Sequence, residues 1–252
     1  MIKYFVLKII SFFDYYHQVK IFKFLRSNNI NSFDIFLDIG AHKGESISLY
    51  LNNFKIKKII SFESSPLNFK KLQNNLKNFQ KKYKYTEILI NNLTLGSKNN
   101  RGILKQIDET SSSTLNNINI ESKYFKRKRS LVYNNNKEKF YTEIPIKITT
   151  LFDYINDNKI ERIDFVKIDT EGYEYEILKG LNNKFSIINF IMFEHHYHDM
   201  IIKNYTFSKI HSLLEKNNFR QFYKAKMPFR KTFEYIYRNN LSLINNEKKK
   251  IT

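Results

Sequence analysis

The segment at residues 165–180, FVKIDTEGYEYEILKG, constrains the fold of this chain more than any other. A short apolar run is followed by Asp169, Thr170, Glu171 and Gly172, and then by a pattern typical of a helix. This order predicts a buried strand of a parallel sheet, a tight turn and a helix. Because parallel α/β sheets bind ligands beyond the carboxyl ends of their strands, Asp169 and Glu171 are candidate site residues.

A second turn of this kind follows the apolar run at residues 35–39. It has the pattern D-x-G-A-x-x-x-G, formed by Asp38, Gly40, Ala41 and Gly44. Glycines permit unusual backbone dihedrals, so that a ligand can rest against the turn and the N-terminus of the next helix. The spacing differs from the G-x-G-x-x-G dinucleotide fingerprint, which disfavours a pyrophosphate cradle.

Glu63 follows the next predicted strand, residues 59–62, and Pro66 is placed for the first turn of another helix. A carboxylate at this position can accept hydrogen bonds from both hydroxyls of a ribose. Together with the glycine turn, Glu63 predicts a site for an adenosyl ligand. A helix start beside a solvated carboxylate is the simpler alternative.

The rest of the chain continues the alternation of strands and helices. Strands are expected at residues 86–90, 144–148, 187–193, 219–223 and 233–237, and helices at 151–155 and 207–217. Residues 97–145 are the least regular part, and apart from the strand at their end we expect loops and a hairpin there. The pattern predicts an α/β fold with a mostly parallel central sheet flanked by helices.

With 252 residues and no Pro/Gly-rich linker, the chain is expected to form one main domain, residues 31–240. Residues 1–30 are predicted to be a helical extension and residues 241–252 a basic tail. Charged residues interrupt the apolar N-terminus, which disfavours a membrane span, and no small-residue cleavage site follows it. We expect an amphipathic helix that packs on the domain, with peripheral membrane contact as the alternative.

The amino-acid composition limits the kinds of site and binding partner that the protein is expected to have. The absence of cysteine excludes disulfides, thiolate nucleophiles and Cys-ligated zinc, and makes a cytoplasmic location the default. The formal net charge of +19 suggests a polyanionic partner, but residues with AT-rich codons supply much of this charge. No nucleic-acid-binding motif accompanies it, so nucleic acid is not expected as a partner. The basic run at residues 123–129 is either a solvated surface or a site for a phosphate-bearing acceptor or anionic lipid.

Residues 33–237 resemble the FkbM family of S-adenosylmethionine-dependent methyltransferases, a branch of the Rossmann-like class. The resemblance lies in the glycine turn, in FESSP (62–66), in ITTLFDYI (148–155), in the segment at 163–181 and in IMFEHH (191–196). It departs from the family pattern at His42 and Lys43, at Ser64 in place of a proline, and at Phe152, which is inserted.

The resemblance implies a class I methyltransferase fold, S-adenosylmethionine as cofactor, and methylation of a hydroxyl on a small-molecule or glycan acceptor. The residues expected to hold the cofactor are Asp38, Gly40, Ala41, Gly44 and Glu63. A Ser-rich segment, residues 111–114, is either a polar loop or helps to close the site, as a corresponding segment does in the family, with Ser113 as a candidate contact.

In methyl transfer from a sulfonium, the cofactor supplies the driving force. The protein mainly positions the nucleophile and accepts the proton that the nucleophile releases. A carboxylate or imidazole can act as the base, so the catalytic candidates are Asp169, Glu171 and His195. The alternative role for the two acids is to cap the next helix. Whether the side chains of Asp169 and Glu171 lie on the same side of the chain depends on the conformation of the turn between them.

Glu174 is expected to be a surface or structural carboxylate. The cluster at residues 194–198 is too local to specify a metal, and no metal site is predicted.

Three rival functions follow from the same residues. A nicotinamide-dependent oxidoreductase is disfavoured by the missing fingerprint glycine. An amino-methylating nucleic-acid enzyme is disfavoured because the chain has 3 prolines and no Pro-Pro pair, although methylation of an RNA ribose stays open. A non-catalytic Rossmann-like protein that binds RNA or an anionic membrane through its basic surface is the main alternative. The sequence leaves the oligomeric state open.

Overall fold

The computed structural model describes residues 2–106, 113–132 and 141–241, with side chains for residues 12–106, 113–127, 129–130 and 141–241. The predicted basic tail, apart from its first residue, and Ser111 and Ser112 of the Ser-rich segment lie outside the described residues.

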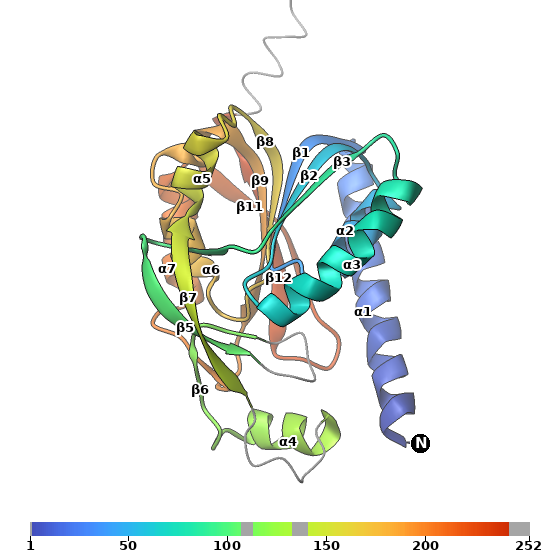
Figure 1. Cartoon of the computed structure of the whole chain (residues 1–252), viewed down its shortest axis with the longest axis vertical. Helices are drawn as coiled ribbons and strands as arrows, with labels where there is room; N and C mark the ends of the chain where they lie inside the picture. Colours follow the sequence, from blue (N-terminus) through green and yellow to red (C-terminus); the bar gives the residue numbers. More distant parts are fainter. Residues whose placement is uncertain (1, 107–112, 133–140, 242–252) are drawn as a thin grey trace, which may run out of the picture.

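A seven-stranded sheet with the order β11-β12-β9-β8-β1-β2-β3 forms the centre of the molecule (Figure 1). The strands, in this order, are β11 (Phe219–Lys226), β12 (Thr232–Asn239), β9 (Ile188–His196), β8 (Ile163–Ile168), β1 (Ser32–Ile39), β2 (Lys55–Phe62) and β3 (Glu87–Asn91). Neighbours from β3 to β9 are parallel, and β12 is antiparallel to both of its neighbours. The predicted α/β fold with a mostly parallel sheet is confirmed.

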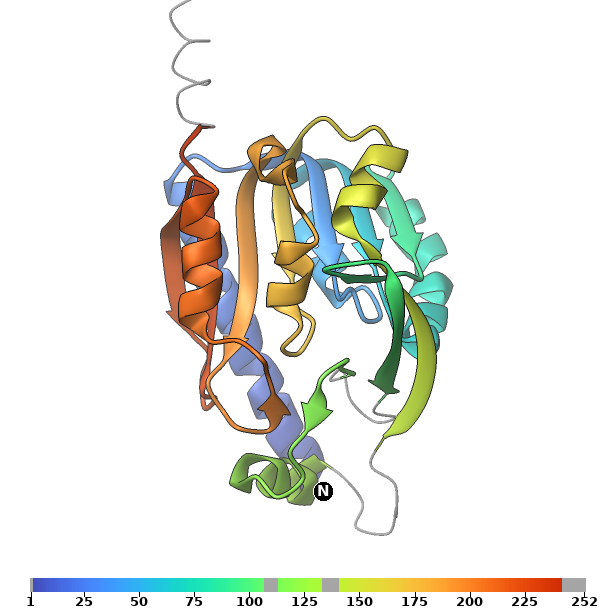
Figure 2. The same ribbon diagram turned by 90° about the vertical axis from the view of Figure 1, so that its left-hand side faces the viewer.

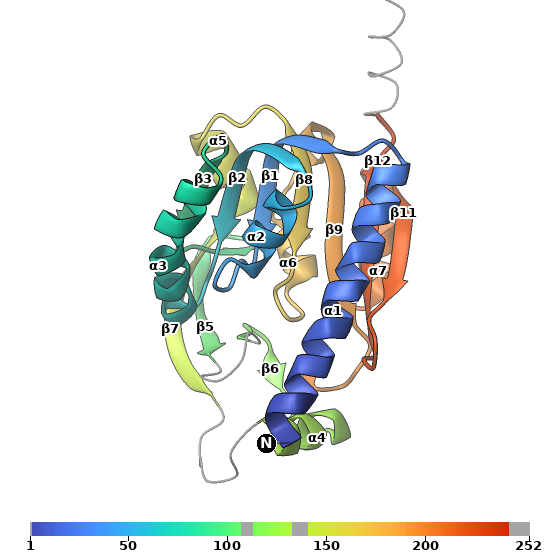
Figure 3. The ribbon, with the colours of Figure 1, turned by 90° about the vertical axis from the view of Figure 1, so that its right-hand side faces the viewer.

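Helices cover both faces of this sheet. One face carries α2 (Glu45–Leu51), α3 (Pro66–Lys82) and part of α1 (Ile2–Ser27), as Figure 3 shows. The other carries α5 (Leu151–Asp157), α6 (Glu174–Lys179) and α7 (Phe207–Lys216), as Figure 2 shows. All six residues of β8 are buried, because this central strand has helices on both sides. This burial explains the nearly continuous apolar run that identified β8 in the sequence.

The irregular region contains more structure than expected. A small sheet with the order β4-β7-β5 is formed by β4 (Thr94–Gly96), β7 (Thr142–Thr150) and β5 (Asn100–Gln106), and β5 and β7 are antiparallel. The basic run, expected in a loop, instead forms α4 (Lys123–Val132). Ser122 caps this helix by accepting a hydrogen bond from the Phe125 N–H, and the Phe125 ring is buried against Met200 and Ile201. The long-range packing of one aromatic ring therefore stabilises a helix in a highly charged segment.

Two short strands hold α4 against the rest of the fold. These strands, β6 (Asn117–Ile118) and β10 (Ile201–Ile202), form an antiparallel pair. A short 3-10 helix, η1 (Lys184–Ile187), leads into β9.

Strand β9 is longer than predicted. The apolar run ends at Phe193, but the strand continues to His196 because it pairs with β12 as far as the Thr232–His196 pair. Side chains alternate between the two faces of a strand. His195 therefore points to the opposite face from Glu194 and His196.

Helix α1 packs on the sheet near its C-terminal end, where Ile21, Phe22 and Leu25 are buried. Its N-terminal half extends past the sheet (Figures 1 and 3). Within the described part of the chain, no helix combines the length and the hydropathy needed to cross a membrane. The predicted cytoplasmic location and the division at residue 30 stay predictions.

Candidate active site

A hollow lies beyond the carboxyl ends of β1, β2 and β8. It is open to solvent, and the space between its walls, part of it open solvent, amounts to about 560 Å³. The predicted site residues in its lining are Gly40, Glu63, Asp169 and Glu171. Apolar walls come from residues that include Phe62, Leu95, Leu104 and Tyr173, and Ser113 and Thr114 lie at its side. Four of the eight residues predicted for the site therefore meet at one edge of the sheet.

Gly40 allows two turns to cross at close range. Its φ is 89°, and a Cβ atom at this position would lie 1.9 Å from the carbonyl oxygen of Asp169. The Asp169 N–H donates to the Ile39 carbonyl at 2.9 Å, and the Gly40 N–H donates to the Phe62 carbonyl at 2.9 Å. Only glycine fits both this backbone conformation and this contact, so Gly40 holds three strand ends together.

The other residues of the glycine turn lie beneath the hollow. Gly44 has a φ of 95°, and a Cβ atom there would lie 2.5 Å from the ring of Phe79, so this glycine lets α3 pack closely. Ala41 is buried in the core. Asp38 is fully buried and accepts a hydrogen bond from the Ser46 hydroxyl, which ties β1 to α2.

Glu63 presents a buried carboxyl group to the hollow. One oxygen accepts the His42 N–H and the other accepts the Ser65 N–H, both at 2.8 Å. Burial raises the pKa of Glu63 to about 7, although these two backbone hydrogen bonds act in the opposite direction. A carboxylate has about four acceptor positions, so two positions are available to hydroxyl groups of a ligand.

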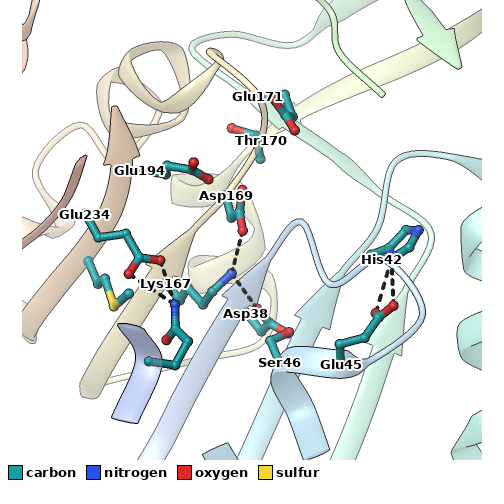
Figure 4. A network of polar contacts seen from close by, with 12 residues as sticks. Asp38, His42, Glu45, Ser46, Lys167, Asp169, Thr170, Glu171, Glu194 and Glu234 are labelled. Carbon is teal, nitrogen blue, oxygen red and sulfur yellow. Dashed lines mark hydrogen bonds and ion pairs between the residues drawn. The ribbon is translucent and has the colours of Figure 1, made fainter. Parts of the chain in front are cut away.

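Lys167 is the buried cation of the site. Its Nζ atom lies 3.1 Å from Asp169 Oδ2 and 3.9 Å from Asp38 Oδ1 (Figure 4). Burial acts to lower the pKa of Lys167, but the two carboxylates outweigh it and raise the pKa. Sequence analysis did not assign Lys167 a role. A lysine inside the short apolar run at residues 165–168 was the signal, since a buried charge needs a partner.

The carboxyl groups of Asp169 and Glu194 are neighbours with opposite pKa shifts. Loss of water favours the neutral form of Asp169, but the Lys167 ammonium outweighs this effect and lowers the pKa. Burial, followed by the nearby carboxylates of Asp169 and Glu171, holds the pKa of Glu194 well above its usual range. The opposite shifts favour the protonated form of Glu194 and the ionised form of Asp169, whose side chain is 37% exposed.

The turn separates the side chains of Asp169 and Glu171. Glu171 has a φ of 51°, and its Oε2 atom lies 3.3 Å from the Nε2 atom of His196. The Thr114 hydroxyl donates to the Glu171 carbonyl at 2.8 Å. Asp169 thus faces Lys167, whereas Glu171 faces His196, a residue to which sequence analysis assigned no role.

Glu174 is a buried structural carboxylate. One of its oxygens accepts the N–H groups of Thr170 at 3.2 Å and Gly172 at 3.0 Å. The other oxygen accepts the Tyr205 hydroxyl at 2.7 Å. This side chain holds the turn after β8 in place from within the helix that follows.

His195 does not join the other candidates. It is 3% exposed on the opposite face of β9, among the rings of Tyr197, Tyr205 and Phe207. Burial, assisted by Lys203, lowers the pKa of His195 to about 3, so the imidazole is neutral. Among the described residues, no group of three His, Asp or Glu side chains is arranged to hold a metal ion.

The sequence model of the methyltransferase FkbM domain matches residues 38–221, well over half of the chain. The chain belongs to the FkbM methyltransferase family. The predicted family and its Rossmann-like methyltransferase fold are thereby confirmed, and the family agrees with the predicted cofactor, S-adenosylmethionine. No curated protein matches the chain.

Solved structures give the same fold. An FkbM methyltransferase from Methylobacillus flagellatus KT is 15% identical with a TM-score of 0.49, and the match covers 81% of this chain and 43% of that one. The chain thus spans less than half the length of that FkbM protein. Magnesium protoporphyrin IX methyltransferase from Synechocystis PCC 6803 with bound S-adenosylhomocysteine is 10% identical with a TM-score of 0.50, covering 94% of this chain and 87% of that one.

Proposed function

We propose that this FkbM-family protein transfers the methyl group of S-adenosylmethionine to a hydroxyl of a sugar-like or other small acceptor. One observation carries the proposal: Glu63, suited to an adenosyl ribose, and the carboxylate of Asp169, suited to a hydroxyl proton, line the same hollow. The remaining lining is a mixture of apolar and polar groups, as small-molecule sites require.

The described residues fit the cofactor. Gly40 contributes no side chain to the floor of the hollow. The Glu63 carboxylate has two hydrogen-bond acceptor positions that can receive the ribose hydroxyls. Phe62 and Leu104 provide apolar walls for an adenine ring. The bound cofactor supplies an electrophilic methyl group on a sulfonium sulfur.

The residues on the acceptor side of the site take up one proton from the acceptor hydroxyl. A hydroxyl group in the hollow donates a hydrogen bond to Asp169, which Lys167 keeps ionised at neutral pH. As the oxygen of the acceptor gains its methyl group, Asp169 takes up the proton that this oxygen releases. Lys167 is a positioning residue because it acts through Asp169.

The acceptor class follows from the groups around Asp169. Glu171 adds a second carboxyl group to the lining of the hollow, and together with Asp169 it offers hydrogen-bond acceptors for several hydroxyls. The same carboxyl groups disfavour an acceptor that carries its own negative charge near the reacting hydroxyl. A neutral polyhydroxylated acceptor fits both conditions.

Calorimetric titration with S-adenosylhomocysteine tests the cofactor half of the proposal. We expect Glu63→Ala to weaken binding by about 10- to 100-fold, because two hydrogen bonds to a charged group are lost. The exposed Glu161 provides the matched control, and Glu161→Ala is expected to bind as the wild type does. Absence of binding by the folded wild type would contradict the proposal and favour the non-catalytic alternative.

Asp169→Asn tests the catalytic half. This variant is expected to bind S-adenosylhomocysteine within a few-fold of the wild type and to lose methyl transfer to a panel of sugars by at least about 100-fold. Transfer of radioactive methyl groups is the measurement. Full transfer by the variant would remove Asp169 from the proposed mechanism.

A further inference from the structure

Exposed aromatic rings gather at one end of the molecule, on α1 and at the turn between β11 and β12. We call Phe12, Tyr15, Tyr16 and Phe229 the aromatic tip; their exposed fractions are 65%, 59%, 50% and 79%. Phe229 has a φ of 60°, a conformation that bulky residues rarely adopt. The turn thus holds a large ring out into solvent at the cost of backbone strain.

Contacts between α1 and the turn fix the aromatic tip as one unit. The rings of Phe13 and Phe229 meet edge to face at 4.9 Å between centroids. The Arg230 guanidinium donates to the Asp14 carboxylate at 2.8 Å. The tip is therefore a built surface, with rings presented from two elements far apart in the sequence.

The sequence extends this apolar character toward the start of the chain. Residues 2–10, IKYFVLKII, continue helix α1 beyond the tip, and Lys3 and Lys8 are their only charged residues. Of the described side chains of α1, the buried apolar ones are Ile21, Phe22 and Leu25, near the opposite end of the helix. The aromatic tip is thus continuous in sequence with the N-terminal half of α1, which projects past the sheet.

A basic helix lies near the N-terminal end of α1, beyond the aromatic tip. The three views agree that α4 lies close to the N-terminal end of α1 (Figures 1, 2 and 3). Phe125 anchors α4 in a small apolar cluster, and the exposed basic residues among the described side chains of the helix are Lys123, Lys126, Arg127 and Arg129. Lys231, next to the turn of the tip, is exposed as well.

The same end of the molecule carries the site. The carboxyl ends of β1, β2 and β8 point toward α4 and the projecting half of α1 (Figures 1 and 3). A flat surface that touched α4 and the aromatic tip would therefore face the edge of the sheet at which the hollow opens.

We propose that the aromatic tip and α4 bind the surface of an anionic lipid bilayer. Aromatic rings prefer the interfacial zone of a bilayer, and Lys and Arg beside them are attracted to anionic headgroups. Charge complementarity favours this partner over a second copy of the chain, because a two-fold contact at the tip would bring two basic α4 helices together. The binding needs no cofactor and is independent of the proposed methyl transfer.

Flotation of the full chain with phosphatidylcholine vesicles, with and without phosphatidylserine, tests the proposal. We expect binding only to the anionic vesicles, weakened by salt. Each basic side chain near an anionic surface contributes about fivefold in affinity, so the triple variant K123E/R127E/R129E is expected to bind at least about 100-fold more weakly. The triple variant K70E/K77E/K81E makes the same charge change on exposed lysines of α3 and is expected to lose much less.

A second pair of variants tests the aromatic tip. Phe229→Ser is expected to weaken vesicle binding about tenfold, whereas Tyr85→Ser, at a ring that is 98% exposed elsewhere, is expected to leave it unchanged. Unaltered binding of S-adenosylhomocysteine shows that each variant is folded, and if the wild type does not bind that ligand, circular dichroism serves instead.

Four outcomes would overturn the proposal. The first is equal binding to neutral and anionic vesicles, and the second is equal loss in the α3 and α4 variants. The third is that Phe229→Ser breaks a dimer of the wild type, and the fourth is that duplex RNA displaces the protein from vesicles at equal charge concentration. Either of the last two outcomes would assign the surface to a different partner.

Discussion

The Nε2 atom of His17 in α1 lies 2.7 Å from the Oε2 atom of Glu234 in β12, and both side chains are buried. Gln18 donates to the same carboxylate at 2.9 Å. Glu234 pairs across the sheet with Glu194, whose carboxyl group is a neighbour of that of Asp169. Helix α1, which precedes the part matched by the family model, therefore reaches the carboxyl groups of the candidate site.

Replacing His17 tests this link. His17→Ala leaves the buried carboxylate of Glu234 without its histidine partner, so we expect the free energy of unfolding to fall by about 2 kcal/mol. Urea denaturation is the measurement. Lys20→Ala, an exposed change in the same helix, is the control and is expected to cost less than about 0.5 kcal/mol. An equal loss of unfolding free energy in the two variants would mean that the contact between His17 and Glu234 makes no specific contribution to stability.

Gly40→Ala is expected to be among the most damaging small substitutions. Its methyl group would lie 1.9 Å from the carbonyl oxygen of Asp169, at a φ that alanine disfavours. The free energy of unfolding should fall by about 3 kcal/mol or more, with loss of S-adenosylhomocysteine binding. Gly102→Ala is the matched control, because its methyl group would meet only side-chain atoms of Ile148 and Leu115. Thermal unfolding that ranks Gly102→Ala as the more damaging change would contradict the role of Gly40.

Lys167→Met removes the cation between two carboxylates. We expect a loss of about 3 kcal/mol in unfolding free energy, because Asp38 stays buried without its positive neighbour. The pKa of Asp169 should rise at the same time, which carboxyl-carbon NMR can follow. Lys179→Met, which breaks a half-exposed pair with Glu176, should cost less than about 1 kcal/mol. An unchanged pKa of Asp169 in Lys167→Met would refute the positioning role of Lys167.

Cofactor binding is expected to depend on pH through Glu63. The pKa of this carboxyl is raised to about 7 by burial, and its ionised form accepts hydrogen bonds from the two ribose hydroxyls more strongly than its protonated form does. Affinity for S-adenosylhomocysteine should therefore be highest above pH 7 and fall by up to about tenfold for each unit below it. Glu63→Gln should bind more weakly and lose this dependence. Titrations across this pH range that show the same slope in both proteins would assign it to another group.

Patterns within short windows of sequence located most of the elements. The strand that contains Asp38 and the strands before Glu63 and Asp169 were recognised because burial on both faces demands a continuous apolar run. The position of Pro66 at the first turn of α3 was predicted correctly, because proline fixes a helical φ and lacks an N–H that this turn does not use. Each of these features depends on neighbours in the chain.

Contacts between distant segments decided the rest. The helix of the basic run depends on Phe125 meeting Met200 and Ile201, and the face of His195 depends on the pairing of β9 with β12. The burial of Glu174 similarly depends on Tyr205 and on the turn that it holds.

The sequence by itself thus determined the alternating α/β fold, the family and the strand ends at which Glu63 and Asp169 stand. Only the tertiary structure decided that Lys167 keeps Asp169 charged, that Glu194 holds the proton and that His195 lies on the far face. The physical reason is that periodicity and turn chemistry are local properties of the chain. The pKa of a buried group is instead set by charges that only the folded sheet brings within a few ångströms of it.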